Sequence, residues 1–186
     1  MSLQRIVITG APGTGKTVVI KELENLGYHC YHEIIRSMTA EAKKVETTQK
    51  QVSNPLVFVN DPLAFNKALL DGRTAHFLDS QSLKVPLCFF DRGIPDVLAY
   101  MDFFKQDYPD TFKIVGNKHR YDKVFILPPW KSIYISDNER MESFEEAEEL
   151  HNYLFNTYQY FGYTPIVVPK TSIALRTEFI LENLKE

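Results

Sequence analysis

The amino-acid sequence predicts an α/β fold, a three-layer α/β/α sandwich in which helices cover both faces of a parallel five-stranded sheet. Short apolar segments of strand length alternate along the chain with longer segments of helical period. A helix between successive strands is the right-handed crossover that a parallel sheet requires. With 186 residues, of which 44% are hydrophobic and 24% charged, the chain can bury one core, so we expect a single domain over residues 1–186.

The first part of the chain is predicted to fold as strand, turn, helix, strand and helix. Residues 5–9 are rich in β-branched side chains and end at a glycine-rich turn. A helix over 16–26 follows, with apolar residues at helical spacing and Gly27 placed to end it. The second strand covers 28–32, and a mostly polar helical segment is predicted over about 33–50.

The middle of the chain repeats this alternation. A helix is predicted over 61–82, because Asp61 is a good N-cap residue and Pro62 suits the first turn. The third strand, 87–91, is an apolar run that ends in an acid. A helix over 95–105 follows it, with apolar residues at helical spacing.

The last part of the chain supplies two further strands. The fourth strand, 123–127, is followed by residues 128–142, which open with two prolines and show no clear period, so we expect a mobile lid there. A serine–glutamate capping box at 143–146 begins the next helix. A fifth strand at 165–168 and a closing helix over 172–184 complete the predicted fold.

Residues 10–17 match the phosphate-binding pattern G-x-x-x-x-G-K-[ST], between a predicted strand and a predicted helix. The glycines let the backbone curl so that successive N–H groups face phosphate oxygens, beside the positive end of the helix dipole. We expect Lys16 to reach the β- and γ-phosphates and the Thr17 hydroxyl to ligate Mg²⁺. The residues expected to hold a nucleoside triphosphate are Gly10, Ala11, Pro12, Gly13, Thr14, Gly15, Lys16 and Thr17.

Asp91 is the second expected contributor to the magnesium site, with Thr17. It closes an apolar strand, and an acid at that position orders the magnesium shell of proteins with this loop. The alternative is a solvated acid at a strand end. We expect ATP with Mg²⁺ as the cofactor, and the sequence leaves GTP open.

Three further segments carry a family resemblance. They are Asp-Arg-Gly-Ile-Pro-Asp at 91–96, Tyr-Asp-Lys-Val-Phe at 121–125 and Leu-Pro-Pro at 127–129. With the 10–17 loop they resemble the P-loop NTPase family described as AAA-domain or predicted ATPases, which looks related to nicotinamide riboside kinase domains and to nucleoside and thymidylate kinases. The resemblance covers nearly the whole chain and implies a nucleotide-kinase-like core with an acceptor pocket and a lid.

The resemblance also implies roles for single residues. Glu33 follows the second strand and is the candidate base for an acceptor hydroxyl, or else a first-turn glutamate that complements a helix dipole. Arg92 would lie at the acceptor or phosphoryl group, and Arg140 in the lid could fold over the γ-phosphate. We expect Asp96 in the first turn of its helix and Arg73 on a solvated helix face, with the acceptor side as the alternative for Arg73. The candidate catalytic residues are Lys16, Asp91, Glu33, Arg92 and Arg140.

Charge and hydropathy exclude some partners. A net charge of −3 and a pI near 6.0 do not provide the broad basic surface that nucleic acid requires, and they fit a small charged substrate better. No apolar segment approaches the roughly 20 residues that cross a bilayer, and no signal-peptide pattern precedes the first strand. We therefore expect a cytoplasmic protein without a membrane span, and the sequence does not fix its oligomeric state.

Three functions fit these features. The first is a phosphotransferase with ATPase activity, which moves phosphate from ATP·Mg²⁺ to an unidentified small hydroxyl- or phosphate-bearing acceptor between the second strand and the Asp91–Arg92 turn. The second is a nucleotide-dependent switch or binding protein with slow hydrolysis, and a pure hydrolase is a third. We favour the kinase.

Overall fold

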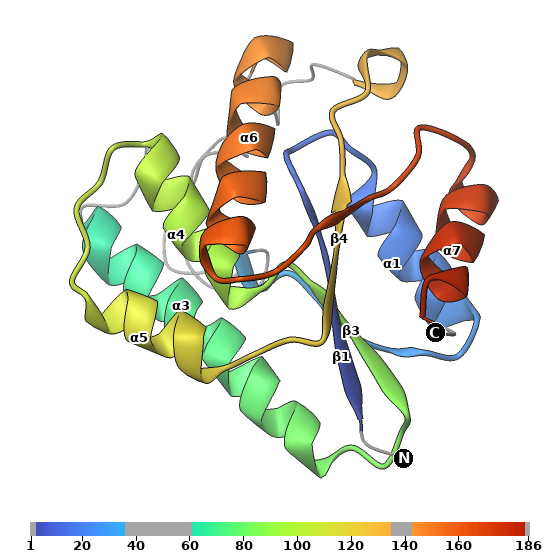
Figure 1. Ribbon diagram of the computed structural model, residues 1–186, viewed down its shortest axis with the longest axis horizontal. Coiled ribbons are helices and arrows are strands. Elements are labelled where there is room, and N and C mark those ends of the chain that lie inside the picture. The colour runs from blue at the N-terminus through green and yellow to red at the C-terminus, as the bar shows by residue number, and fades with distance from the viewer. Residues whose placement is uncertain (1–2, 36–60, 135–142, 185–186) are drawn as a thin grey trace, which may run out of the picture.

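The computed structural model describes residues 3–35, 61–134 and 143–184, and the structural statements below concern these residues. It contains the predicted parallel sheet with helices on both faces, so the predicted fold class is confirmed (Figure 1). The strands are β1 (Gln4–Gly10), β2 (His29–Tyr31), β3 (Leu87–Asp91), β4 (Lys123–Leu127) and β5 (Ile166–Val167). Their order in the sheet is β2-β3-β1-β4-β5, and every pairing is parallel.

The described helices follow the predicted alternation, with one addition. They are α1 (Lys16–Asn25), α3 (Pro62–Asp79), α4 (Ile94–Phe103), α5 (Thr111–Lys118), α6 (Phe144–Tyr160) and α7 (Ile173–Glu182), with short 3₁₀ turns η2 (Ser80–Ser82) and η3 (Lys131–Ile133). Helix α5 was not predicted, because it is short and buries only Phe112 and Gly116. Most of the helix expected over 33–50, and residues 135–142 of the expected lid, lie outside the described residues.

The predicted helix ends are confirmed where local chemistry marks them. Asp61 accepts a hydrogen bond from Ala64 N at 3.0 Å and caps α3. Ser143 and Glu146 form the predicted capping box of α6. Gly27, directly after the C-cap of α1, has a φ of 89°, the left-handed conformation that commonly ends a helix.

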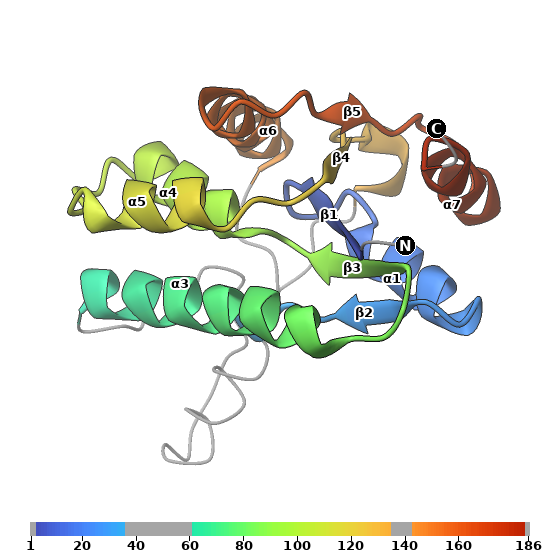
Figure 2. The ribbon, with the colours of Figure 1, turned by 60° about the horizontal axis from the view of Figure 1, so that its bottom comes forward.

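The core lies on both faces of the sheet, because successive strand residues point to opposite sides. Val7 and Phe90 pack under α3, α4 and α6 on one face. Ile8 and Phe89 pack with α1 and α7 on the other face. The two helical layers are visible on either side of the sheet in Figures 1 and 2.

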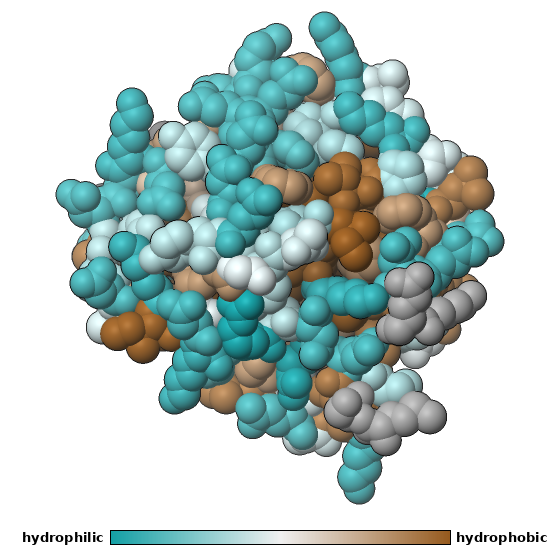
Figure 3. Space-filling view, viewed as in Figure 1, coloured by the Kyte–Doolittle hydropathy of each residue, from teal (hydrophilic) through white to brown (hydrophobic). Residues whose placement is uncertain are grey.

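The surface of the described residues is mainly polar. Hydrophilic side chains predominate on the face shown in Figure 3, and its main group of hydrophobic side chains lies right of centre, over β4. None of the described helices combines the length and the apolar character needed to cross a membrane.

The strand order decides what gathers at the carboxyl edge of the sheet. Strand β3 lies between β1 and β2, and Ile8 of β1 is the register partner of Asp91. The 10–17 loop leaves β1, the Asp91–Arg92 turn leaves β3, and Glu33 follows β2. The chain segments that carry these predicted site residues are therefore neighbours at one edge.

Candidate active site

The loop between β1 and α1 has the backbone that its glycines permit. Gly10, Gly13 and Gly15 have φ values of 146°, 75° and 87°, which other residues rarely adopt. A Cβ at Gly10 would also lie 2.5 Å from the carbonyl oxygen of Leu127. Both the backbone conformation and the contact with β4 therefore require glycine at the start of the loop.

The N-terminus of α1 differs from three other described helix starts. Asp61, Ser143 and Ser172 cap α3, α6 and α7 with a side-chain hydrogen bond. Within the described residues, α1 has neither a side-chain cap nor an acid in its first turn. The positive end of its dipole therefore faces the loop without a neighbouring negative side chain in the first turn, which fits a phosphate group at the loop.

Lys16 lies inside the loop. Its Nζ donates a hydrogen bond to the Ala11 carbonyl oxygen at 2.8 Å, and the side chain is buried. Burial, and next the positive charge of Arg92, lower the pKa of Lys16 to about 7, although Asp91 and Glu33 act in the opposite direction. The ammonium group therefore lies within electrostatic reach of the other predicted site residues.

The donors available for Mg²⁺ are hard oxygen atoms, as this ion prefers. Asp91 is the buried last residue of β3, and Thr17 is in the first turn of α1. Among the described residues no group of three or more His, Cys, Asp or Glu side chains is placed to hold a metal ion. A magnesium ion held by Thr17 and Asp91 would take its remaining ligands from phosphate oxygens and water, which is how Mg²⁺ is usually bound with nucleotides.

Glu33 forms a buried ion-pair cluster with two arginines. Its Oε1 lies 3.0 Å from Arg73 Nη2, and its Oε2 lies 2.5 Å from Arg92 Nε. All three side chains are nearly buried, with exposed fractions of 11%, 5% and 10% for Glu33, Arg73 and Arg92. The expectation that Arg73 lies on a solvated helix face is wrong, because α3 packs against α4 and this side chain bonds to Glu33 and Gly93, in the segments that follow β2 and β3.

Arg92 is held in an unusual conformation. Its φ is 74°, a left-handed value that is uncommon for a residue other than glycine. Its backbone N–H donates to Ile8 O at 3.1 Å, and its guanidinium carbon lies 5.0 Å from the centre of the Tyr100 ring. Ion pairs with Glu33 and Asp96 complete its environment, so the fold fixes both the backbone and the side chain.

Asp96 is in the first turn of α4, as predicted, but it is fully buried. Its carboxylate accepts hydrogen bonds from Thr9 Oγ1 and Tyr158 Oη, each at 2.5 Å, and from Gly93 N at 3.0 Å. It also pairs with Arg92 at 3.1 Å. Asp96 thus joins β1, α4 and α6 to the arginine, a role that its sequence position does not reveal.

The two buried acids are both ionised at neutral pH. Burial raises the pKa of Glu33, but the charges of Arg73 and Arg92 outweigh it, so the pKa is lowered. The pKa of Asp96 is lowered for the same reason, with hydrogen bonds from Thr9 and Tyr158 adding to the effect. A lowered pKa makes Glu33 a weak proton acceptor but keeps it ionised, so that it can accept charge-assisted hydrogen bonds.

The cluster retains hydrogen-bonding capacity. Arg73 Nε and Glu33 Oε2 are buried and have no hydrogen-bond partner among the described residues. Glu33 Oε2 lies close enough to Arg92 for a strong ion pair, but not in hydrogen-bond geometry. Buried polar atoms usually have a partner, so these two atoms are hydrogen-bonding capacity that the described residues do not use.

Four of the five predicted catalytic residues lie close together in the structure. The charges of Asp91, Glu33 and Arg92 all act on Lys16, so these four form one cluster. Arg140 lies outside the described residues. Thr9 and Tyr158 were not predicted, because a threonine at a strand end and a tyrosine in an apolar helix face carry no distinguishing signal.

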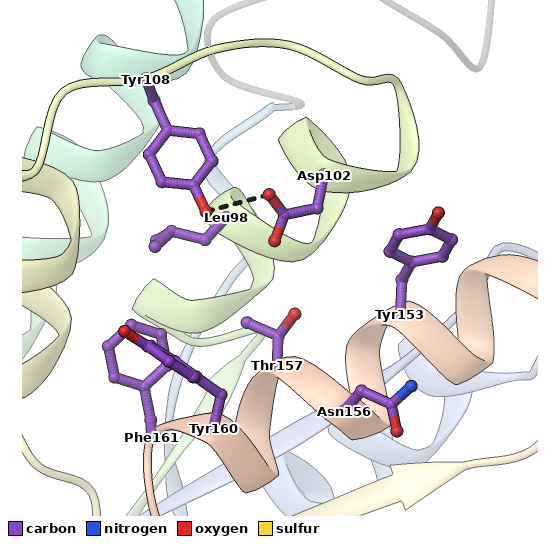
Figure 4. Close-up of a pocket in the computed structure, with 8 residues that line it drawn as sticks. All are labelled: Leu98, Asp102, Tyr108, Tyr153, Asn156, Thr157, Tyr160 and Phe161. Atoms are coloured by element: carbon purple, nitrogen blue, oxygen red, sulfur yellow. Dashed lines mark hydrogen bonds between the residues drawn. The ribbon is translucent and has the colours of Figure 1, made fainter.

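A separate cavity of about 340 Å³ lies between α4 and α6 (Figure 4). It is lined by Leu98, Asp102, Tyr108, Tyr153, Asn156, Thr157, Tyr160 and Phe161. The Tyr108 hydroxyl donates to Asp102 at 2.9 Å across its rim. None of the predicted site residues lines this cavity, so it is not part of the charged cluster.

Comparison with known proteins places this geometry in context. A family profile described as "AAA domain" matches residues 5–176. No curated protein sequence matches the chain. Among solved structures, deoxyadenosine kinase from M. mycoides with bound dATP is 18% identical, with a TM-score of 0.59 and coverage of 98% of this chain and 100% of that one. Thymidylate kinase from Ehrlichia chaffeensis is 12% identical, with a TM-score of 0.64 and coverage of 99% and 100%.

A third similar structure is the NadR protein in complex with NAD and AMP-PNP. It is 14% identical, with a TM-score of 0.66, and the match covers 97% of this chain and 48% of NadR, so the chain spans about half of that protein. At these identities the likenesses show the fold. It is the α/β fold of nucleoside and nucleotide kinases, as the sequence predicted.

Proposed function

This chain belongs to the AAA-domain family, and on that premise we propose that it is a small-molecule kinase. The 10–17 loop would bind the phosphates of ATP, and Thr17 and Asp91 would hold Mg²⁺. An acceptor with a hydroxyl or phosphate group would lie beside Glu33, Arg73 and Arg92. The dATP and AMP-PNP bound to two of the similar proteins make adenine nucleotides the first donors to test.

The observation that carries this proposal is the position of Glu33. A protein that only binds or hydrolyses a nucleotide needs the loop, Lys16 and Asp91. Here a buried carboxylate and two arginines, with spare hydrogen-bonding atoms, lie beside them. A second polar site whose charges act on Lys16 of the phosphate loop supports transfer to an acceptor.

Each residue of the site would have a distinct role in phosphoryl transfer. In the transfer, an acceptor oxygen forms a bond to the γ-phosphorus, the bond to the bridging oxygen breaks, and ADP leaves. Lys16 would stabilise charge on the phosphate oxygens, and bound Mg²⁺ supplies further neutralisation of that charge. Glu33 would accept a hydrogen bond from the acceptor hydroxyl and so orient its oxygen, and Arg92 would hold Glu33 in place.

The low pKa of Glu33 is compatible with this role. In a loose phosphoryl-transfer transition state the acceptor hydroxyl loses little of its proton before the new bond forms. A weak base that orients the oxygen is then sufficient. The proton passes to Glu33 or to solvent as the product forms.

An acceptor screen tests the proposal. Purified protein is incubated with γ-labelled ATP, Mg²⁺ and single nucleosides, nucleotides or vitamin-like alcohols, and the label is followed into organic phosphate or orthophosphate. Deoxyadenosine and thymidylate come first, because two of the similar proteins are kinases named for them. Transfer to an acceptor, lost in Lys16→Ala, is the expected result. Label that appears only in orthophosphate, with every acceptor and with a metabolite extract, would contradict it and favour a nucleotide-dependent switch with slow hydrolysis.

A further inference from the structure

Arg176, near the start of α7, is a buried arginine that contacts the phosphate loop from outside. Only 5% of it is exposed. Its Nη1 donates to the Thr14 carbonyl oxygen at 3.1 Å, and its Nε donates to the Thr171 carbonyl oxygen at 2.8 Å. Its guanidinium carbon lies 5.3 Å from the centre of the Trp130 ring. One side chain therefore joins the phosphate loop to the segments that follow β4 and β5.

The charge of Arg176 has no described counter-charge. Arg73 and Arg92 are also buried, but each pairs with Glu33. In the part of the chain that the structure describes, the partners of Arg176 are two backbone carbonyl groups and an indole ring, all uncharged. A guanidinium keeps its proton in proteins, and a buried charge without a counter-charge is costly. Helix α7 thus holds a positive charge against the loop that an anion there would compensate.

The hydrogen bond to Thr14 also fixes the direction of one peptide group. In a planar trans peptide, the carbonyl oxygen and the following N–H point in opposite directions. Arg176 holds the Thr14 carbonyl toward α7, so the Gly15 N–H points away from α7. A Cβ at Gly15 would lie 2.9 Å from Arg176 Nη1, which shows how closely the guanidinium packs on this peptide. A charge-assisted hydrogen bond polarises the peptide and makes its N–H a stronger donor.

We propose that Arg176 is a positioning residue of the phosphate site. Its guanidinium fork binds Thr171 through Nε and holds the Thr14–Gly15 peptide through Nη1, with the Gly15 N–H directed toward the bound phosphates, and its charge adds to the positive potential there. This inference rests on the proposed function, because it takes the loop as the triphosphate site. Arg176 acts through the loop and does not have to touch the nucleotide.

Two substitutions separate the charge of Arg176 from its geometry. Arg176→Gln removes the charge, and Arg176→Lys keeps the charge without the fork. The control is Arg120→Gln, because Arg120, although it is exposed, also donates to a carbonyl oxygen, that of Phe161, and lies over a ring, that of Tyr163 at 3.9 Å. Calorimetry measures the affinity of each variant for MgATP and for inorganic tripolyphosphate, and circular dichroism measures the folded fraction and the melting temperature without ligand.

We expect Arg176→Gln to bind both ligands roughly 10- to 100-fold more weakly, as for the loss of a charge-assisted hydrogen bond. Arg176→Lys should lie between Arg176→Gln and the wild type, and Arg120→Gln should bind as the wild type does. The ligand-free melting temperature of Arg176→Gln should not fall in proportion, because the substitution also removes an uncompensated charge. A purely structural role predicts the reverse, a loss of stability with unchanged affinity of the folded fraction.

Wild-type affinity in folded Arg176→Gln would overturn the inference. If that variant does not fold, Arg176→Lys decides, since wild-type affinity in the lysine variant would show that the fork is not needed. The proposed function is tested separately by Lys16→Ala in the same assay. If the wild type binds neither ligand, or if Lys16→Ala leaves both affinities unchanged, the loop is not the triphosphate site. Loss of binding in Lys16→Ala with full binding in Arg176→Gln refutes only the inference.

Discussion

Arg92 Nε lies 2.5 Å from Glu33 Oε2, so two residues that follow different strands form one buried ion pair at the carboxyl edge of the sheet. Arg73 contacts the other oxygen of Glu33 from α3 at 3.0 Å. The carboxylate is thus fixed between two guanidinium groups, and its direction is set before any ligand binds. Such preorganisation is what positioning an acceptor requires.

Replacement of Glu33 by Gln is expected to lower acceptor-dependent turnover by roughly 10²-fold, the lower end of the range for a positioned acid–base group, because Glu33 mainly orients the acceptor oxygen, and to change MgATP affinity much less. The substitution keeps the shape of the side chain but removes the negative charge with which Arg73 and Arg92 both pair. The control is Glu24→Gln, which removes a carboxylate from an exposed pair with His32 at 2.6 Å and should leave turnover unchanged. The measurement is the initial rate of acceptor phosphorylation per amount of folded protein. Wild-type turnover in Glu33→Gln would exclude Glu33 from the reaction.

Binding of MgATP should be coupled to proton uptake by Lys16. Burial, and next Arg92, lower the pKa of Lys16 to about 7 without nucleotide, and phosphate charge will raise it. Above pH 7 the bound state therefore holds more protons than the free state, and affinity should fall as the pH rises through about 7. Calorimetry near about pH 8 in two buffers of different ionisation enthalpy measures this uptake. The same binding enthalpy in both buffers would show that no proton is taken up and would contradict the prediction.

The same pKa has a consequence for stability. Between pH 7 and the ordinary lysine pKa of 10.5 the unfolded chain binds a proton at Lys16 that the folded protein does not. The free energy of unfolding of the ligand-free wild type should therefore rise with pH across this window, relative to Lys16→Met. Parallel curves for the two proteins would show that the pKa of Lys16 is not lowered.

Asp91→Asn should weaken nucleotide binding in the presence of Mg²⁺ much more than in its absence. The substitution keeps the shape of a buried residue and removes only the negative charge expected in the metal shell. Titrations of both proteins with ATP, in Mg²⁺ and in EDTA, give the loss of affinity with and without the metal ion. Equal losses would mean that Asp91 supports the fold and not the metal.

Tyr158→Phe should lower the free energy of unfolding by about 1.5–3 kcal/mol, the range for a hydrogen bond to a charged group. The hydroxyl donates to the carboxylate of Asp96 at 2.5 Å, and both residues are fully buried. Tyr108→Phe removes the same kind of hydrogen bond, to the exposed Asp102 at 2.9 Å, and should cost less than about 1 kcal/mol. Urea unfolding measures the free energy of unfolding of both variants. Equal losses would show that burial does not strengthen the hydrogen bond of Tyr158.

Gly15→Ala and Gly27→Ala form a matched pair, because the two glycines have φ values of 87° and 89°. Both substitutions carry the strain of a left-handed residue, about 1–2 kcal/mol. A Cβ at Gly15 would also lie 2.9 Å from Arg176 Nη1, whereas one at Gly27 would meet nothing within 4 Å. Only Gly15→Ala should lower tripolyphosphate affinity. The difference in affinity between the two variants, measured by calorimetry, separates the effect of a side chain at the phosphate loop from the backbone strain that both variants share.

The features that the sequence predicts well are those whose causes lie within a few residues of each other. The cap at Asp61, the capping box at Ser143 and the loop over 10–17 each depend on neighbouring residues, so local chemistry suffices. Helix α5 has only two buried side chains and therefore gives too weak a period to be recognised. Its position depends on packing against α4.

The contacts of the buried charged residues could be predicted only in part. Sequence reasoning named Glu33 and Arg92 but gave them no contact. It also placed Arg73 on a solvated face and did not consider Arg176. Both arginines have the sequence surroundings of ordinary helix residues, and their burial follows from contacts with segments far away in the chain. Patterns of period and charge do not report such contacts.

The sequence by itself determined the strands, the helix starts and the glycine-rich loop, because each follows from local residue types. Only the tertiary structure decided that β3 lies between β1 and β2. The strands are similar apolar segments, so local pattern does not specify which of them pair, and their order is set by how the helices pack on the two faces. That order places Arg92 between Glu33 and the phosphate loop and so brings the residues of the candidate site together.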